Sequence, residues 1–110
     1  MTSQIHAKLC KTFDSGKTLP LGYRRTQLLS LARLVQENTD TLQDAVNSDL
    51  GRCKFETNLG EISPVISACL LAASSLEEWS KPTKPPVEDW RSSFNTTIHR
   101  AAKGIVINIA

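Results

Sequence analysis

Three cysteines carry the strongest intrinsic chemistry in this sequence. Cys10, Cys53 and Cys69 are an odd number of thiols, and their spacing fits neither a disulfide framework nor a zinc site. Cys69 falls on the apolar stripe of a predicted helix, which favours a buried, structural thiol. Cys53 lies between Arg52 and Lys54, whose charges would favour a thiolate, but it has no histidine or asparagine near it in the sequence. We therefore predict reduced, mostly structural thiols and no catalytic residue.

The remaining reactive groups form no recognisable catalytic or metal site. His6 and His99 are the only histidines and lie far apart in the sequence, so a surface role is favoured over metal binding. Glu77 and Glu78 could be read as paired carboxylates for acid–base chemistry. Adjacent residues on a helix do not face each other, so a solvated helix face is the better interpretation. We predict no metal site.

Helices must position most of these groups, because apolar residues recur at helical spacing over the first 80 residues. Pro20 suits the first turn of a helix and marks the start of one predicted helix. Gly51 is favoured at the position after a helix and marks the end of the next one. Pro64 is expected near the start of a helix or at a mild kink. The predicted helices cover residues 5–13, 20–35, 38–50 and 62–79.

The residues after position 80 change character. Lys81–Pro86 contains three prolines and predicts an extended stop, with Trp79 and Trp90 packing beside it. Residues 94–100 mix polar and apolar side chains, as an edge strand does, and residues 104–110 form an apolar run typical of a buried parallel strand. We therefore predict a mostly α-helical chain with two C-terminal β-strands. A parallel strand needs neighbours, so the chain is expected to be the front of a larger α/β protein.

Composition excludes several classes of function. The chain has 110 residues, with 13 basic and 11 acidic side chains, so its net charge of +2 gives no basic stripe for nucleic acid. No run approaches the about 18–20 consecutive apolar residues of a membrane span, so no membrane segment is expected. The N-terminus lacks the apolar core of a secretory signal, so we predict a cytoplasmic protein.

Three motifs together resemble the N-terminal portion of the aldehyde dehydrogenase superfamily. Their order and spacing, with Trp79 three residues before Pro82, are most like the class 3 branch, which handles fatty and aromatic aldehydes. The resemblance covers about residues 9–110, nearly the whole chain. The motifs are Leu19-Pro20-Leu21-Gly22-Tyr23-Arg24-Arg25-Thr26-Gln27-Leu28, then Asp49-Leu50-Gly51-Arg52 before Lys54-Phe55-Glu56, and Gly104-Ile105-Val106-Ile107-Asn108-Ile109-Ala110.

The resemblance implies an α/β fold and an oxidoreductase that converts aldehydes to carboxylic acids with NAD or NADP. It assigns residues 1–92 to the helical segment of the dinucleotide-binding domain, 93–103 to a bridging or oligomerisation strand region, and 104–110 to the first strand of a Rossmann-like sheet. Ile109 and Ala110 match the strand end that lines the cofactor cleft. The family's glycine-rich turn, glutamate base and cysteine nucleophile would all follow this sequence. The chain alone is therefore expected to be inactive and not to bind the cofactor.

The resemblance also implies partners, namely the aldehyde substrate of the full-length enzyme and a second copy in a homodimer. A different class of function stays open beside it. The chain could be a stand-alone helical interaction module that pairs with the edge of a partner's sheet through residues 104–109.

Overall fold

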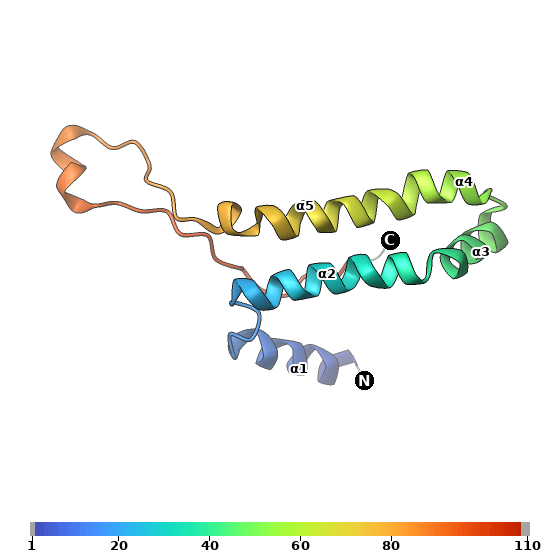
Figure 1. Ribbon diagram of the computed structural model, residues 1–110. Coiled ribbons are helices and arrows are strands. Elements are labelled where there is room, and N and C mark those ends of the chain that lie inside the picture. The colour runs from blue at the N-terminus through green and yellow to red at the C-terminus, as the bar shows by residue number, and fades with distance from the viewer. Residues whose placement is uncertain (1, 109–110) are drawn as a thin grey trace. The chain divides into compact units, whose positions relative to one another are not determined.

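The computed structural model describes residues 2–108, with side chains described from residue 4. The described chain divides into two compact units. The first is Leu19–Leu76, and the second combines the described parts of Met1–Thr18 and Glu77–Ala110. Figure 1 shows helices over most of the chain and an extended segment near its C-terminal end.

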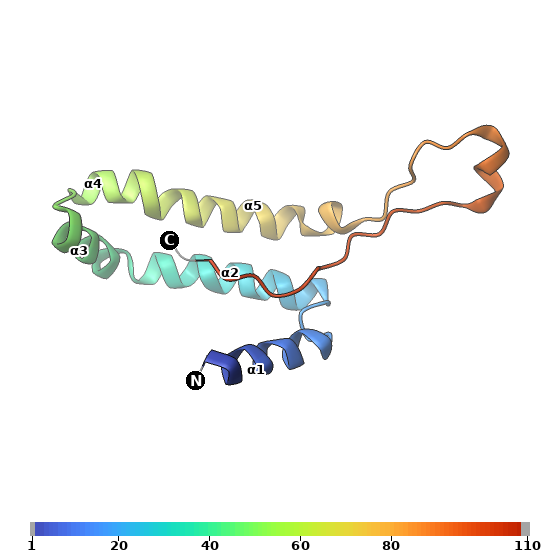
Figure 2. The same cartoon turned by 180° about the vertical axis from the view of Figure 1, so that it is seen from behind.

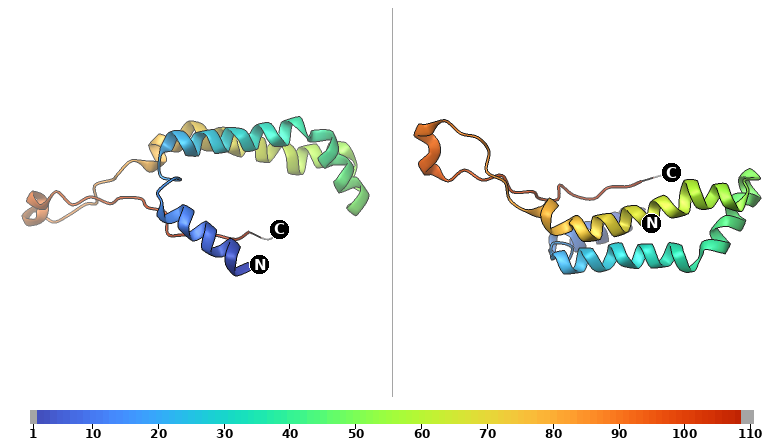
Figure 3. Two further views of the ribbon diagram at one scale, coloured as in Figure 1. Left: turned by 90° about the horizontal axis from the view of Figure 1, so that it is seen from below. Right: turned by 45° about the horizontal axis from the view of Figure 1, so that its top comes forward.

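The unit Leu19–Leu76 is built on two long helices. Helix α2 (Leu21–Glu37) and helix α5 (Ser63–Ser80) run side by side in opposite directions (Figures 1 and 3). Between them in the sequence lie the shorter elements α3 (Thr39–Leu50), α4 (Lys54–Thr57) and the π-helix η1 (Asn58–Ile62). Arg25 of α2 donates a hydrogen bond from Nε to the carbonyl oxygen of Ala73 in α5 at 3.2 Å, which joins the two long helices.

Small side chains dominate the buried positions of this unit. Ala32 on α2 and Cys69 and Ala73 on α5 are each at most 6% exposed, and Ile62 and Leu76 are the larger buried apolar residues. Close-packed contacts between such side chains provide the dispersion energy of a core. Cys69 is therefore a packed core thiol, as its place on the apolar stripe predicts.

The helix ends follow local rules. Pro20 precedes α2 with φ −60° and ψ 129°, so its fixed φ costs nothing at the start of the helix. Asn38 ends α2 and precedes α3, and its amide donates to the carbonyl oxygen of Leu34. Gly51 ends α3 with φ 64°, a left-handed conformation that glycine adopts without the steric cost of a Cβ.

Pro64 explains the π-helix. Proline has no amide hydrogen, so the carbonyl oxygen of Gly60 cannot accept the usual bond from four residues ahead. The chain widens just before it, and the amide of Ser63 donates to the carbonyl oxygen of Asn58, five residues back. Pro64 consequently lies at the second residue of α5, directly after the π-helix and inside the continuous helix that begins at Lys54.

The elements α4, η1 and α5 form one uninterrupted helix, Lys54–Ser80, of 27 residues. An 18-residue window of it has a mean hydropathy of 1.5, so by length and composition alone it could cross a membrane. Serines interrupt this stretch, so it contains no long run of consecutive apolar residues although its mean hydropathy is high. Core helices of globular proteins pass the same test, so this property does not assign the helix to a membrane.

The other unit contains helix α1 (Thr2–Asp14) and a long two-legged arm, with the 3-10 helix η2 (Asp89–Phe94) at its tip (Figures 1 and 2). The legs of the arm meet at one antiparallel bridge. The amide of Thr83 donates to the carbonyl oxygen of Ile98 at 3.1 Å, and the reverse bond measures 2.8 Å. The Arg100 guanidinium adds a 2.6 Å bond to the carbonyl oxygen of Lys81.

The prediction of two C-terminal β-strands is wrong for this chain. Between residues 2 and 108 the structure contains no strand, and the Thr83–Ile98 bridge is isolated. Phe94 belongs to η2, and residues 104–108 are irregular, with Val106 88% and Ile107 76% exposed. A strand is held by hydrogen bonds to a neighbouring strand. No such neighbour lies beside 104–108 in the described chain, so a favourable sequence pattern is not enough.

Candidate functional site

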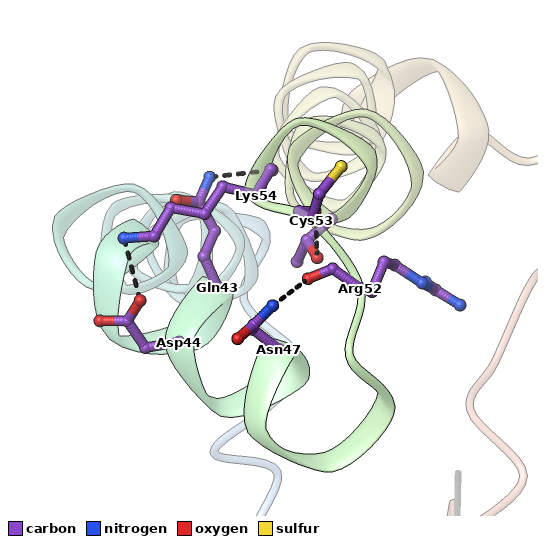
Figure 4. Close-up of polar contacts among 7 residues, drawn as sticks. Gln43, Asp44, Asn47, Arg52, Cys53 and Lys54 are labelled. Atoms are coloured by element: carbon purple, nitrogen blue, oxygen red, sulfur yellow. Dashed lines mark hydrogen bonds and ion pairs between the residues drawn. The ribbon is translucent and has the colours of Figure 1, made fainter.

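The turn between α3 and α4 gathers several polar side chains (Figure 4), and it contains the Asp49–Arg52 motif. The amide of Gly51 donates to the carbonyl oxygen of Asn47 at 2.8 Å. The Asn47 side chain then reaches past the turn and donates from Nδ2 to the carbonyl oxygen of Arg52 at 2.9 Å. Asn47 thus accepts one bond from the turn and donates another to it, and the two bonds hold the turn against the end of α3.

Lys54 and Gln43 hold the start of α4 against α3. The Lys54 ammonium lies 2.9 Å from Asp44 Oδ1, and Gln43 donates from Nε2 to the carbonyl oxygen of Lys54 at 3.4 Å. The hydrogen bond to Asp44 and the charge of that carboxylate, helped by Asp40, raise the pKa of Lys54 above its ordinary value. Lys54 therefore stays charged and engaged throughout the physiological range.

Arg52 joins the same turn to the π-helix. Its Nη1 lies 2.6 Å from Oε1 of Glu61, and both side chains are partly exposed. Thr57 is fully buried, and its Oγ1 donates to the carbonyl oxygen of Cys53 in the turn at 3.2 Å. The ion pairs of Arg52 and Lys54 thus each connect one helical element to the next.

Cys53 is exposed at this turn but has no chemical partner there. Figure 4 shows its sulfur directed away from the ends of the Arg52 and Lys54 side chains, which pair with Glu61 and Asp44 instead. No hydrogen bond joins this thiol to an acid or base within the described residues. Among the described residues this turn therefore contains no nucleophile–base pair.

A second thiol does have a partner, which sequence reasoning missed. Cys10 lies on α1 with Sγ 3.8 Å from Nδ1 and 3.6 Å from Nε2 of His6. The signal was present in the sequence, because residues four apart are neighbours on a helix surface. His6 is therefore not isolated. In the part of the chain that the structure describes, three or more metal-ligating side chains do not come together anywhere.

The aromatic residues beside the proline-rich stretch do not pack as expected. Trp79 is 53% exposed and Trp90 is 63% exposed. Trp90 lies in η2, where its Nε1 donates to Glu88 at 2.6 Å, Arg91 stacks on its ring at 4.4 Å, and Phe94 meets it edge-on at 6.3 Å. These contacts are all local, so Trp90 organises the tip of the arm and does not anchor the prolines.

A shallow hollow of about 460 Å³ lies on the Leu19–Leu76 unit, with residues from α2 and α5 around it. Its walls combine apolar side chains such as Leu29 and Leu70 with Arg33 and Glu37, which are 3.9 Å apart. No thiol or imidazole lines it. The hollow could accommodate an apolar group but offers no group that would react with one.

The predicted cofactor-binding residues, Ile109 and Ala110, lie outside the described residues. The described residues themselves do not fit a dinucleotide. They contain no strand leading through a glycine-rich turn into a helix, which is the element that holds the pyrophosphate in a Rossmann-like domain. No step of hydride transfer can therefore be assigned to them.

Comparison with known proteins decides the relationship. The chain is 33% identical over 102 residues to aldehyde dehydrogenase family 3 member B2 of Mus musculus, covering 93% of this chain and 21% of the relative. It is 31% identical over 103 residues to aldehyde dehydrogenase family 3 member B1 of Homo sapiens, covering 94% and 22%. This chain is related to the class 3 aldehyde dehydrogenases.

The similarity extends beyond animals. A beta-apo-4'-carotenal oxygenase of Gibberella fujikuroi is 33% identical over 102 residues, covering 90% of this chain and 19% of the relative. No family model matches the chain. The chain spans about a fifth of the length of these curated relatives. The class 3 resemblance inferred from three motifs is thereby confirmed, and the α3–α4 turn is the place where one of those motifs folds.

Proposed function

We propose that this chain is the N-terminal part of a class 3 aldehyde dehydrogenase, an enzyme that oxidises fatty or aromatic aldehydes to carboxylic acids with NAD or NADP. The observation that carries the proposal is the match of more than nine-tenths of the chain to about a fifth of each relative. On this proposal the chain alone is inactive and binds no cofactor. Its helices form part of the scaffold of the dinucleotide-binding domain.

The chemistry of the reaction supports inactivity of the chain alone. Aldehyde oxidation needs a thiolate to add to the carbonyl carbon, donors to stabilise the resulting oxyanion, and a bound nicotinamide to take the hydride. Among the described residues Cys53 has no base and Cys69 is buried. Cys10 has His6 beside it, but both lie on the face of a helix, where no oxyanion donors converge. The reaction therefore needs groups from elsewhere.

Uncovered apolar side chains support a scaffold role. On α2, Leu31 is 47% and Leu34 56% exposed, and on α5, Leu70 is 50% and Leu71 59% exposed. Covering such side chains contributes roughly 25 cal/mol per Å² of apolar surface removed from water. A further domain packed on these helices would gain that energy. The proposed segments 1–92, 93–103 and 104–110, with Ile109 and Ala110 at the cofactor cleft, describe how the chain would join it.

Reconstitution tests the proposal. The chain would be co-expressed with the remainder of the human relative that follows the matched region, and reduced nicotinamide would be measured with a medium-chain aldehyde. We expect a co-purifying pair that is active, with neither part active alone. A matched control carries Val106→Asp, which should weaken the pair because the segment at Val106 would be covered in the assembled enzyme. Activity of the chain alone, or failure to form any complex, would contradict the proposal.

A homodimer and a cytoplasmic location belong to the same proposal. A relative from Rattus norvegicus, 27% identical over 99 residues, is named aldehyde dehydrogenase, dimeric NADP-preferring. That name supports a second copy as partner, whereas the near-neutral charge gives no support to nucleic-acid binding. Light scattering on the reconstituted pair would give the mass of the assembly, and a mass of one complete enzyme would contradict the dimer.

An independent interaction module is the second candidate, and the exposure of Val106 and Ile107 favours it. An exposed, extended apolar segment can add to the edge of a partner's sheet. A chain that is monomeric, monodisperse and melts cooperatively on its own would favour this function. Aggregation of the isolated chain that Val106→Asp relieves would favour the enzyme scaffold instead.

A further inference from the structure

We propose that Cys10 and His6 form a base-assisted thiol site on α1 that exchanges with small anionic or neutral disulfides such as oxidised glutathione. The site is independent of the proposed aldehyde oxidation. It rests on the placement of the two side chains and on the contrast with the other two cysteines of the chain.

The geometry holds a proton acceptor beside the thiol in either tautomer of the imidazole. Cys10 Sγ lies 3.8 Å from Nδ1 and 3.6 Å from Nε2 of His6, both within the range of a sulfur hydrogen bond. A neutral imidazole always has one nitrogen without a hydrogen. Whichever nitrogen that is, rotation of the imidazole about its side-chain bonds can aim it at Sγ, so it can accept the Cys10 proton without rearrangement of the helix.

Access favours the same site. Cys10 is half-buried and His6 is exposed, so a small disulfide can reach the sulfur from solvent while α1 holds the thiol in place. Cys69 is buried in the core of the other unit and cannot react without unfolding. Cys53 is more exposed than Cys10 but has no base. If exposure alone decided the rate of disulfide exchange, Cys53 would react faster than Cys10. If a neighbouring base decides it, Cys10 reacts faster.

The exchange step balances without an external oxidant. His6 takes the proton from Cys10 Sγ, and the thiolate attacks one sulfur of the disulfide. The bond from Sγ to that sulfur forms while the S–S bond of the reagent breaks. The leaving thiolate takes up a proton from solvent or from the His6 imidazolium. Cys10 is oxidised to a mixed disulfide, and one half of the reagent is reduced to a thiol.

The test uses the folded 110-residue chain and oxidised glutathione near neutral pH, with peptide mass spectrometry to follow each cysteine. We expect Cys10 to form the adduct faster than Cys53 by on the order of fivefold, a modest share of what a positioned base supplies in enzymes. His6→Gln should lower the Cys10 rate to that of Cys53 or below. His99→Gln, the matched control, should leave both rates unchanged.

Comparing the Cys10 and Cys53 rates within one molecule distinguishes loss of the base from a variant that perturbs folding. Glutamine has a higher helix propensity than histidine, so His6→Gln should preserve α1, which circular dichroism can check. The Cys53 rate in the same molecule reports any general opening. Equal rates at Cys10 and Cys53 in the unaltered chain, or a Cys10 rate unaffected by His6→Gln, would overturn the proposal.

Discussion

Gly51 offers a direct test of the turn that carries the family motif. It is the residue after α3, with φ 64°, and an added Cβ would meet nothing within 4 Å. Gly51→Ala therefore introduces no clash with neighbouring side chains. Any effect on stability must come from the backbone conformation itself.

The magnitude follows from two opposing terms. A residue with a Cβ pays roughly 1–2 kcal/mol to adopt the left-handed conformation. Alanine also restricts the unfolded chain, which returns about 0.4–1 kcal/mol to the folded state. We expect Gly51→Ala to lower the free energy of unfolding by about 1 kcal/mol, the difference between these terms.

Gly60 provides the matched control. It lies in η1 within the long helix, and its added Cβ also meets nothing within 4 Å. Gly60→Ala should raise the free energy of unfolding by about 0.8–1 kcal/mol, because alanine has the higher helix propensity. For a chain of this size, the two variants should differ in melting temperature by on the order of 10 °C.

The assay is thermal unfolding followed by far-ultraviolet circular dichroism, with both variants and the unaltered chain at one concentration. Opposite shifts are expected. If Gly51→Ala leaves the melting temperature unchanged or raises it, the turn does not have the left-handed geometry on which the site is built. If Gly60→Ala lowers it, the helix-propensity argument for the control is wrong.

Three other predictions concern the polar contacts. Asn47→Ala should lower the free energy of unfolding by about 0.5–1.5 kcal/mol, because the hydrogen bond to the Arg52 carbonyl is lost. Urea unfolding would measure this change. An unchanged free energy of unfolding would contradict the role of Asn47 in holding the turn. Glu61→Gln should cost below about 1 kcal/mol, an effect that high salt should erase, because its ion pair with Arg52 is partly exposed. Hydrogen bonding and charge between Lys81 and Glu78 lower the pKa of Glu78 and raise that of Lys81. The lowered Glu78 pKa contributes stability that is present above the ordinary pKa of 4.5 and is lost as the pH falls through the folded value. The raised Lys81 pKa contributes stability that is fully present below the ordinary pKa of 10.5 and is lost as the pH rises through the higher folded value. Side-chain NMR titration would show both shifts, and ordinary pKa values in the folded chain would contradict the pair.

The helical part of the fold was predictable because its causes are local. The left-handed end at Gly51 and the start after Pro20 each depend on a few neighbouring residues. The burial of Cys69 follows from the apolar stripe of a single helix. The relationship to class 3 aldehyde dehydrogenases could also be predicted from the sequence, because it depends on the order of motifs and not on three-dimensional contacts.

The features that the sequence analysis did not predict have both local and non-local causes. The apolar run around Val106 has the composition of a buried strand, but the described chain provides no neighbour to pair with it, so Val106 is exposed. The π-helix before Pro64 depends on how one missing amide shifts the hydrogen bonds of its neighbours. The His6–Cys10 contact depends only on helical spacing, because residues four apart are neighbours on a helix surface.

The α3–α4 turn shows why similarity to an enzyme family does not by itself place chemistry on this chain. Lys54, Arg52 and Asn47 are all engaged in bonds that connect α3, α4 and η1. Breaking any of these bonds to free a side chain for catalysis would loosen the joint between the helices. These three side chains therefore hold the geometry of the joint between the helices. Under the proposed function this turn belongs to the scaffold, and the catalytic groups come from elsewhere in the enzyme.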